Sequence, residues 1–242
     1  PPPRDSIRRQ RQMCIRDSLG FMEPAIRANK GFIDSYEGDA IMALFEGTAD
    51  DAVRAGIGDL EALAEFNRVR AKRGESAIRI GVGINSGRLM LGTIGGHRRI
   101  KCGVIGDPVN VSSRIEGMTK QYGTPLLISE STLSGLQNPG EYETRPIDRV
   151  VVQGKTEPVS IYEVLNGLGP AERDRKLETR DDFVRALELF RSGEMNASKR
   201  AFEAIGASRL DPAVELYIAR CEGYLASGVP DDWAGFVRMT SK

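Results

Sequence analysis

The chain has 242 residues, of which 40% are apolar and 28% charged, and its 34 basic side chains balance 34 acidic ones. This neutrality argues against a nucleic-acid binder, which would carry a basic excess. Three widely separated cysteines and a single histidine argue against a disulfide framework, a zinc ribbon and a His-based catalytic triad. No apolar run approaches the about 18 residues of a membrane-spanning helix. We therefore expect a cytoplasmic segment, and membrane attachment of a longer parent protein stays open.

Residues 1–18 show neither a helical nor a strand period, and they are rich in proline and arginine. They also lack the apolar core of a secretory signal. We interpret this stretch, which resembles translated adapter sequence, as a non-native tail, with a disordered basic tail as the alternative. The fold prediction therefore starts at Leu19.

From Leu19 the pattern is that of an ordered α+β domain ending near Leu165. A short helix with a Gly stop precedes a hairpin over 31–47, whose turn lies at Gly38-Asp39. Thr48 suits the N-cap of a long helix. The further elements expected in chain order are strands over 78–84, 89–94 and 102–105, a helix over 108–122 capped by Asp107, a strand over 124–129, and two or three strands over 142–161.

The remainder of the chain divides by composition into a linker over 166–180 and helices over 181–242. The spacing of Phe190 and Phe202 around Gly193 resembles a tetratricopeptide unit, although an ordinary helical hairpin explains it equally well. A single such unit cannot bury its own apolar face, so we expect the tail to pack on something. A protein partner is one candidate.

Trp233 and Phe236 lie near the carboxyl end of this tail. Aromatic side chains at this place can close a helical hairpin or dock on the preceding domain. We expect the simpler outcome, in which they close the hairpin.

Three separated clusters carry side chains suited to binding a metal ion or a phosphate. Asp39 lies at a hairpin turn, where an exposed carboxylate can ligate Mg²⁺. Asn110 and Arg114 are four residues apart on a predicted helix, so one face presents an amide and a guanidinium that can hold a phosphate. Lys155, in a Gly-Lys turn, offers a point charge for a phosphate. Taken singly, each is better explained as an ordinary turn, a solvated helix face or a hairpin lysine.

The segments FIDSYEGDAIMALF, IRIGVGINSG, VIGDPVNVSSR and GKTEPVSIYEV follow one another between Phe32 and Val164. Their order and spacing resemble the catalytic domain of the class III nucleotidyl cyclases, the adenylate and guanylate cyclases. The resemblance implies a ferredoxin-like, palm-like core over 19–165 that works as a homodimer. It also implies conversion of ATP to 3′,5′-cyclic AMP and pyrophosphate in cyclic-nucleotide signalling, with two Mg²⁺ or Mn²⁺ ions at the reacting oxygens.

Position by position, the resemblance makes Asp39 a metal ligand and Asn110 the residue that orients the ribose. Arg114 corresponds to the residue that stabilises charge on the transferred phosphate. Lys155 corresponds to a lysine that contacts the terminal phosphates in some members.

The sequence departs from the family pattern at two places. Ser35 and Gly103 occupy the purine-reading positions, where adenylate cyclases usually carry Lys and Thr or Asp, so ATP is expected from bacterial relatives and GTP is the alternative substrate. The F-x-D-[IM]-x-x-F strand with the first metal aspartate is not found, so we interpret the domain as lacking its first strand and expect little or no activity from this fragment. The competing hypothesis is a catalytically silent cyclase-like module that binds nucleotide or dimerises.

Overall fold

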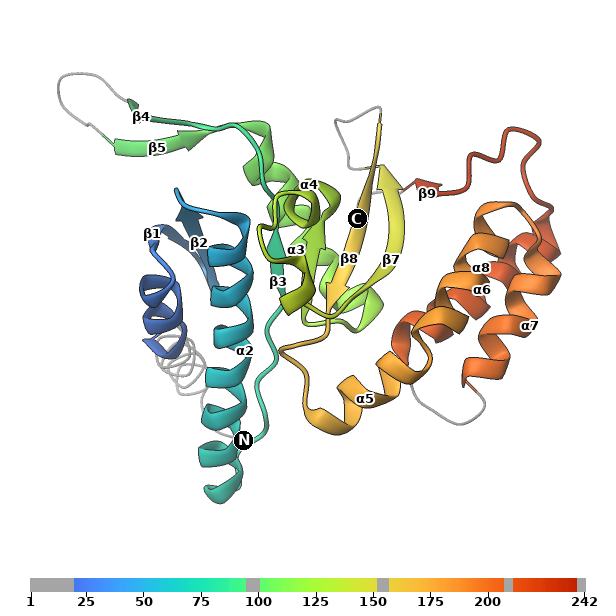
Figure 1. Ribbon diagram of the computed structural model, residues 1–242, viewed down its shortest axis with the longest axis horizontal. Coiled ribbons are helices and arrows are strands. Elements are labelled where there is room, and N and C mark those ends of the chain that lie inside the picture. Colours follow the sequence, from blue (N-terminus) through green and yellow to red (C-terminus); the bar gives the residue numbers. More distant parts are fainter. Residues whose placement is uncertain (1–19, 95–100, 152–156, 207–210, 239–242) are drawn as a thin grey trace, which may run out of the picture. The chain divides into compact units, whose positions relative to one another are not determined.

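The computed structural model describes residues 20–94, 101–151, 157–206 and 211–238 (Figure 1). These residues form two compact units, each built from separated stretches of sequence. The first unit contains the described residues up to Ile80, together with Leu89–Gly106 and Gly135–Gln137. The second unit contains Gly81–Arg88, Asp107–Ser134 and the described residues from Asn138 onward.

The first unit opens with a helix over residues 20–28. The antiparallel strands β1 (Gly31–Glu37) and β2 (Ala40–Phe45) follow, and the helix α2 (Ala49–Lys72) packs on them. Thr48 caps α2 as predicted: its hydroxyl accepts from the Asp51 amide at 3.3 Å, and its own amide donates to the Asp51 carboxylate at 2.9 Å. This reciprocal pair is a capping box, which explains why the helix starts here.

A second hairpin in the first unit consists of β4 (Met90–Ile94) and β5 (Lys101–Ile105), which pair antiparallel. Their bounds agree with the predicted strands to within a residue. Met90 is 71% exposed and Leu91 50% exposed, so the described chain leaves the start of this hairpin in solvent.

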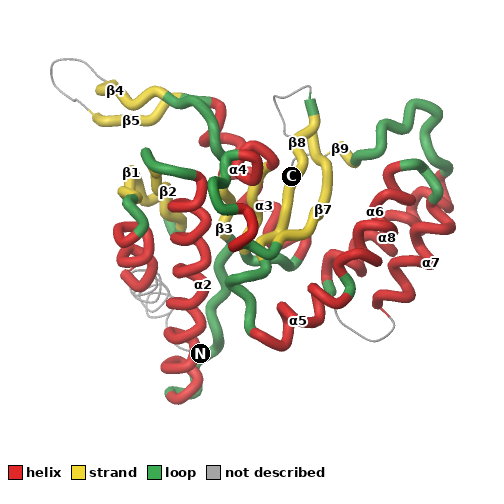
Figure 2. Tube along the Cα trace, in the orientation of Figure 1, coloured by secondary structure: helices red, strands yellow, loops and turns green. Residues whose placement is uncertain are grey.

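The second unit contains a five-stranded sheet in the order β3-β6-β8-β7-β9. Figure 2 labels four of these strands, β3, β8, β7 and β9. The outer pairs β3–β6 and β7–β9 are parallel, and the two inner pairs are antiparallel. The helix α3 (Asp107–Tyr122) packs on β3 and β6, and it starts one residue earlier than predicted. The strands are β3 (Val82–Ile84), β6 (Leu126–Ser129), β7 (Thr144–Val151), β8 (Pro158–Val164) and β9 (Val237–Arg238), with a short helix α4 (Glu130–Ser134) after β6.

The predicted strand over 78–84 is shorter in the structure, where only Val82–Ile84 forms β3. Asn67 of α2 explains the difference, because its side-chain amide both donates to the Ile78 carbonyl and accepts from the Ile78 amide, each at 2.8 Å. A side chain therefore satisfies the backbone at Ile78 in place of a neighbouring strand.

Residues within the predicted linker form a helix, α5 (Pro170–Glu178). Pro170 takes the first helical position, where its missing N–H costs nothing, and strong helix formers follow it. Three more helices complete the tail: α6 (Arg180–Arg191), α7 (Met195–Gly206) and α8 (Pro212–Ser227). The predicted α+β class with carboxyl-terminal helices is confirmed.

The tail helices share one apolar core with the sheet and α3. The sheet contributes Leu127, Ile147, Val150 and Ile161, and the tail contributes aromatic side chains, including Phe183, Phe190 and Tyr217. Figure 1 shows α6 and α8 on the β7 side of the sheet. The apolar face of the tail is therefore buried against the sheet of the same chain.

A group of four buried charges lies where the tail meets the sheet. The Arg145 guanidinium contacts Glu163 at 2.7 Å and Asp211 at 2.8 Å, and the Lys176 ammonium donates to the other oxygen of Glu163. Arg145 and Glu163 belong to β7 and β8, whereas Lys176 and Asp211 belong to α5 and the N-cap of α8. Two cations and two anions thus join the sheet to the first helix of the tail and to the start of α8.

Trp233 closes the tail as expected. Its ring packs edge-on against Phe190 and Tyr224, and its indole N–H donates to the Arg191 carbonyl at 3.0 Å. The segment that follows returns to the sheet as β9. No helix within the described ranges is both long and apolar enough to cross a membrane.

Candidate active site

The β1–β2 hairpin presents Asp39 at its tip. The strands pair up to Glu37 and Ala40, so Gly38 and Asp39 form a two-residue turn in which Gly38 has a φ of 67°. This left-handed first position matches hairpin turns of the type that favours glycine. The Asp39 side chain is exposed, and its carboxylate is free of packing that would prevent ligand contact.

Ser35 lies on the same hairpin, next to an irregularity in the pairing. The register shifts between Ile33 and Ser35, so Asp34 is an extra residue opposite β2. The Ser35 hydroxyl is buried and has no hydrogen-bond partner among the described residues. A buried hydroxyl without a partner is costly, and bulges are common beside functional sites, so Ser35 is an unusual polar position on this hairpin.

Asn110 and Arg114 lie one turn apart on α3, as the sequence predicts. Asn110 is exposed and Arg114 is half-buried. Two hydrogen bonds hold the first turns of α3: Asn85 donates to the Pro108 carbonyl at 3.1 Å, and Ser112 donates to the Gly83 carbonyl at 2.7 Å. The amide and the guanidinium therefore share one face of a helix whose start is fixed to the β3 segment.

An open pocket of about 460 Å³ lies beside the first turn of α3. Its wall includes Asp107, Pro108 and Val111 from α3, Asn85 from the loop after β3, and Ser131 from the short helix α4. The Ser131 hydroxyl donates to the Asn85 side-chain oxygen at 3.0 Å, so this polar wall is already hydrogen-bonded. Asn85 and Ser131 were not among the residues predicted from the sequence, although Asn85 belongs to an Asn-Ser-Gly signal directly after the strand.

Of the two remaining predicted site residues, Gly103 and Lys155, the structure describes only Gly103. Gly103 lies on β5 and pairs with Gly92, while Lys155 lies outside the described residues. Ser35, Asp39 and Gly103 belong to the first unit, and Asn110 and Arg114 belong to the second. The structure thus joins Ser35 with Asp39 on one hairpin and Asn110 with Arg114 on one helix.

The described residues do not complete a metal site. A divalent magnesium ion needs several hard oxygen ligands, and among these residues no three His, Cys, Asp or Glu side chains come together. Asp39 supplies one exposed carboxylate of suitable chemistry. A two-metal centre therefore does not fit this part of the chain alone.

Comparisons with known proteins agree with the motifs found in the sequence. Residues 35–166 match the model of the adenylate and guanylate cyclase catalytic domain. An adenylate cyclase of Anabaena cylindrica is 49% identical over 156 residues, which cover 62% of this chain and 31% of that protein. The terminal-differentiation specific adenylate cyclase of Dictyostelium discoideum is 32% identical over 210 residues, which cover 84% of this chain and 10% of that protein.

The crystal structure of the guanylyl cyclase Cya2 superposes with a TM-score of 0.51 at 33% identity, over 63% of this chain and 78% of that one. The chain spans less than a third of the length of the two curated relatives. Because the Dictyostelium match covers 84% of the chain, the similarity must continue past residue 166 into the tail.

Proposed function

Because the chain belongs to the adenylate and guanylate cyclase catalytic domain family, we propose that it forms the catalytic domain of an adenylate cyclase acting in cyclic-nucleotide signalling. The reaction converts ATP to 3′,5′-cyclic AMP and pyrophosphate. The 49% identity to an adenylate cyclase supports ATP as the substrate. Members of the family act on ATP or GTP and form dimers, and we propose a homodimer for this chain, without nucleic acid as a partner.

The shared face of Asn110 and Arg114 on α3 is the observation that carries this proposal. In the reaction the ribose 3′-oxygen forms a bond to the α-phosphorus, the bond to the oxygen bridging to the β-phosphate breaks, and the hydroxyl proton is lost to water. Negative charge grows on the α-phosphate during this exchange. A planar guanidinium such as Arg114 stabilises that charge, while the Asn110 amide holds the ribose for in-line attack.

Family members depend on divalent metal ions, and we propose Asp39 as one ligand of Mg²⁺ or Mn²⁺. Among the described residues no three side chains that could hold a metal ion come together, so the roles assigned above belong to the chain's own side chains alone. We expect little turnover from the 242-residue chain by itself. Lys155 stays a proposed contact of the terminal phosphates.

A silent nucleotide-binding or dimerisation module is the second candidate. Ser35 and Gly103 support it, because neither provides the ammonium or carboxylate expected for reading adenine. The 49% identity to an adenylate cyclase nevertheless favours ATP. ATP is therefore the proposed nucleotide, with GTP as the comparison in each assay.

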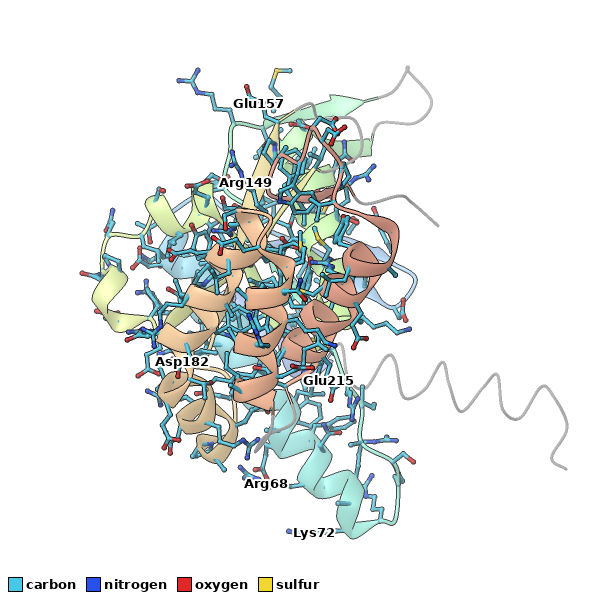
Figure 3. All side chains as sticks on the ribbon, turned by 90° about the vertical axis from the view of Figure 1, so that its right-hand side faces the viewer. Arg68, Lys72, Arg149, Glu157, Asp182 and Glu215 are labelled. Atoms are coloured by element: carbon cyan, nitrogen blue, oxygen red, sulfur yellow. The ribbon has the colours of Figure 1, made fainter. Side chains whose placement is uncertain are left out.

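The test measures cyclic nucleotide formed from ATP and from GTP, with Mg²⁺ or Mn²⁺, in this chain and in a longer natural chain containing it. In the active form, Arg114→Ala should lower kcat/KM by about 10²–10³. The matched control is Arg185→Ala on α6, whose guanidinium pairs with the exposed Asp182 (Figure 3), and it should leave kcat/KM unchanged. Unchanged turnover in Arg114→Ala would remove Arg114 from the site, and nucleotide binding without product in either chain would favour the silent module.

A further inference from the structure

The carboxyl end of α3 is tied to the tail by three side chains, of which Tyr122 and Asp148 are buried and Arg220 is partly buried. Tyr122, the last residue of α3, donates its hydroxyl to the Asp148 carboxylate of β7. Arg220 of α8 donates to Asp148 at 2.6 Å and to the Tyr122 oxygen at 3.1 Å. The three groups close a triangle that links a helix, a strand and a tail helix.

Burial makes this triangle rigid and keeps its protons in place. Tyr122 is 0% exposed and Asp148 2% exposed. Burial, together with the Asp148 charge, raises the pKa of the Tyr122 hydroxyl, so it stays a donor. Burial disfavours the Arg220 charge, but Tyr122 and Asp148 raise the pKa of Arg220 above its usual range. Hydrogen bonds to charged groups in such surroundings are strong, and losing one partner is costly.

The start of α8 also touches the end of α3. Gly123, which follows α3, has a φ of 63°, and a Cβ placed on it would lie 2.5 Å from the Pro212 ring. Only glycine allows both this left-handed conformation and this close approach. Val111 and Ile115 of α3 lie in the same apolar core as Val214 of α8. The tail therefore contacts α3 along its buried face as well as at its end.

Arg114 and Tyr122 are two turns apart on one continuous helix, about 12 Å along its axis. The β3 segment holds the first turns of α3 through Ser112 and Asn85, and the triangle holds the last turn. A helix held at both ends has one orientation, and loss of the second anchor lets the first turns tilt. Shifts of about 1 Å in positioning groups can cost about 10² in rate.

We infer that Arg220, with Asp148 and Tyr122, positions α3 and thereby the face that carries Asn110 and Arg114. The tail is then part of the support of the nucleotide site in addition to covering the sheet. These three are positioning residues, since the reacting groups are contacted through α3 and not by them. The link to nucleotide rests on the proposed function.

The test compares Arg220→Ala with Arg220→Lys, which keeps the charge, and with Trp233→Phe. Trp233 is a matched control because it packs on Phe190 and Tyr224 of the tail and donates to Arg191. Amide hydrogen exchange of residues 107–114 is measured in the native 242-residue chain, relative to amides of β6 that exchange by global unfolding. ATP dissociation constants are measured on the same samples.

In Arg220→Ala we expect exchange over residues 107–114 to rise about tenfold and the ATP dissociation constant to rise by a similar factor, which corresponds to the loss of one charged hydrogen bond. Arg220→Lys should recover part of both effects, and Trp233→Phe should show neither. Unchanged exchange in Arg220→Ala would overturn the positioning of α3 while the proposed function stands. Altered exchange with an unchanged dissociation constant would overturn the link to nucleotide. A wild-type chain that binds no ATP would count against the proposed function, and the exchange data would still decide the positioning.

Discussion

Two buried carboxylate sites, one in each unit, differ in the partners that meet the charge. In the second unit, the fully buried Glu163 contacts both Arg145 and Lys176, and Asp211 contacts Arg145. In the first unit, Asp59 of α2 is 8% exposed, and one of its oxygens is buried without a hydrogen-bond partner among the described residues. A buried carboxylate keeps its charge only where a cation or several donors meet it.

The pKa values follow this contrast. Burial opposes the Asp211 charge, yet Arg145 lowers the pKa of that carboxyl below its usual range. Burial alone raises the pKa of Asp59 from 3.8 to about 7. Asp51, close to Asp59 in sequence, has its pKa lowered to about 2, chiefly by the hydrogen bond from the Thr48 amide. Local partners, and not depth alone, therefore decide which form of each group the fold stabilises.

Removing Arg145 from the buried group of four charges should have the largest effect on the free energy of unfolding. Arg145→Ala leaves Glu163 and Asp211 buried with one cation fewer, so we expect the free energy of unfolding to fall by about 3–5 kcal/mol. Urea denaturation followed by circular dichroism measures the change. Arg185→Ala, which removes an exposed pair with Asp182, is the control and should cost less than about 1 kcal/mol. A similar small loss in Arg145→Ala would show that the cluster is not a single buried network.

Replacing Asp59 by a neutral side chain should change the free energy of unfolding by an intermediate amount, and it should stabilise the fold. Because the folded-state pKa of Asp59 lies above 3.8, the folded state binds more protons, and stability falls as pH rises from about 4 to about 7. Asp59→Asn removes this dependence and should raise the free energy of unfolding at pH 8 by about 1–3 kcal/mol. Denaturation series between pH 4 and pH 8 measure both quantities.

Asp51→Asn is the matched control for this experiment. The folded-state pKa of Asp51 is about 2, so its carboxylate stabilises the fold above pH 4 and that contribution is lost as pH falls from about 4 to about 2. Asp51→Asn should therefore destabilise the chain at pH 8. If Asp59→Asn and Asp51→Asn changed the free energy of unfolding at pH 8 in the same direction, the contrast between paired and unpaired carboxylates would be wrong.

The smallest effect on stability is expected from changing Thr48, which is hydrogen-bonded to Asp51 at the start of α2. Thr48→Ala removes the hydroxyl from the capping box and should cost about 1 kcal/mol. Thr48→Ser keeps the acceptor oxygen and should cost only a fraction of that amount. Thermal unfolding of the two variants measures the difference, and equal melting temperatures for Ala and Ser would mean that the cap hydroxyl does not stabilise α2.

Elements specified by local signals were predictable from the sequence. The Gly38-Asp39 turn, the Thr48 cap and the helix that carries Asn110 and Arg114 all depend on neighbouring residues, and the structure places each as expected. The same local signals put the candidate site residues on a hairpin turn and on one helix face. Their roles in chemistry stay predictions.

Features that depend on distant partners were not predictable. The stretch around Lys176 has the composition of a linker, but its ammonium is buried because Glu163 of β8 meets it. The strand predicted over 78–84 forms only at Val82–Ile84, because the Asn67 side chain takes the backbone hydrogen bonds of Ile78. The pocket wall at Asn85 and Ser131 forms only when the loop after β3 meets the helix α4. In each case the deciding group lies outside any local sequence window.

The return of the chain at β9 protects the sheet from other molecules. β9 pairs in parallel with Val150 and Val151 at the outer margin of β7. An uncovered strand margin offers unpaired amides and carbonyls on which a foreign strand can add, leading to aggregation. The segment that Trp233 fixes to the helices therefore also keeps the last residues of β7 from templating intermolecular strand addition.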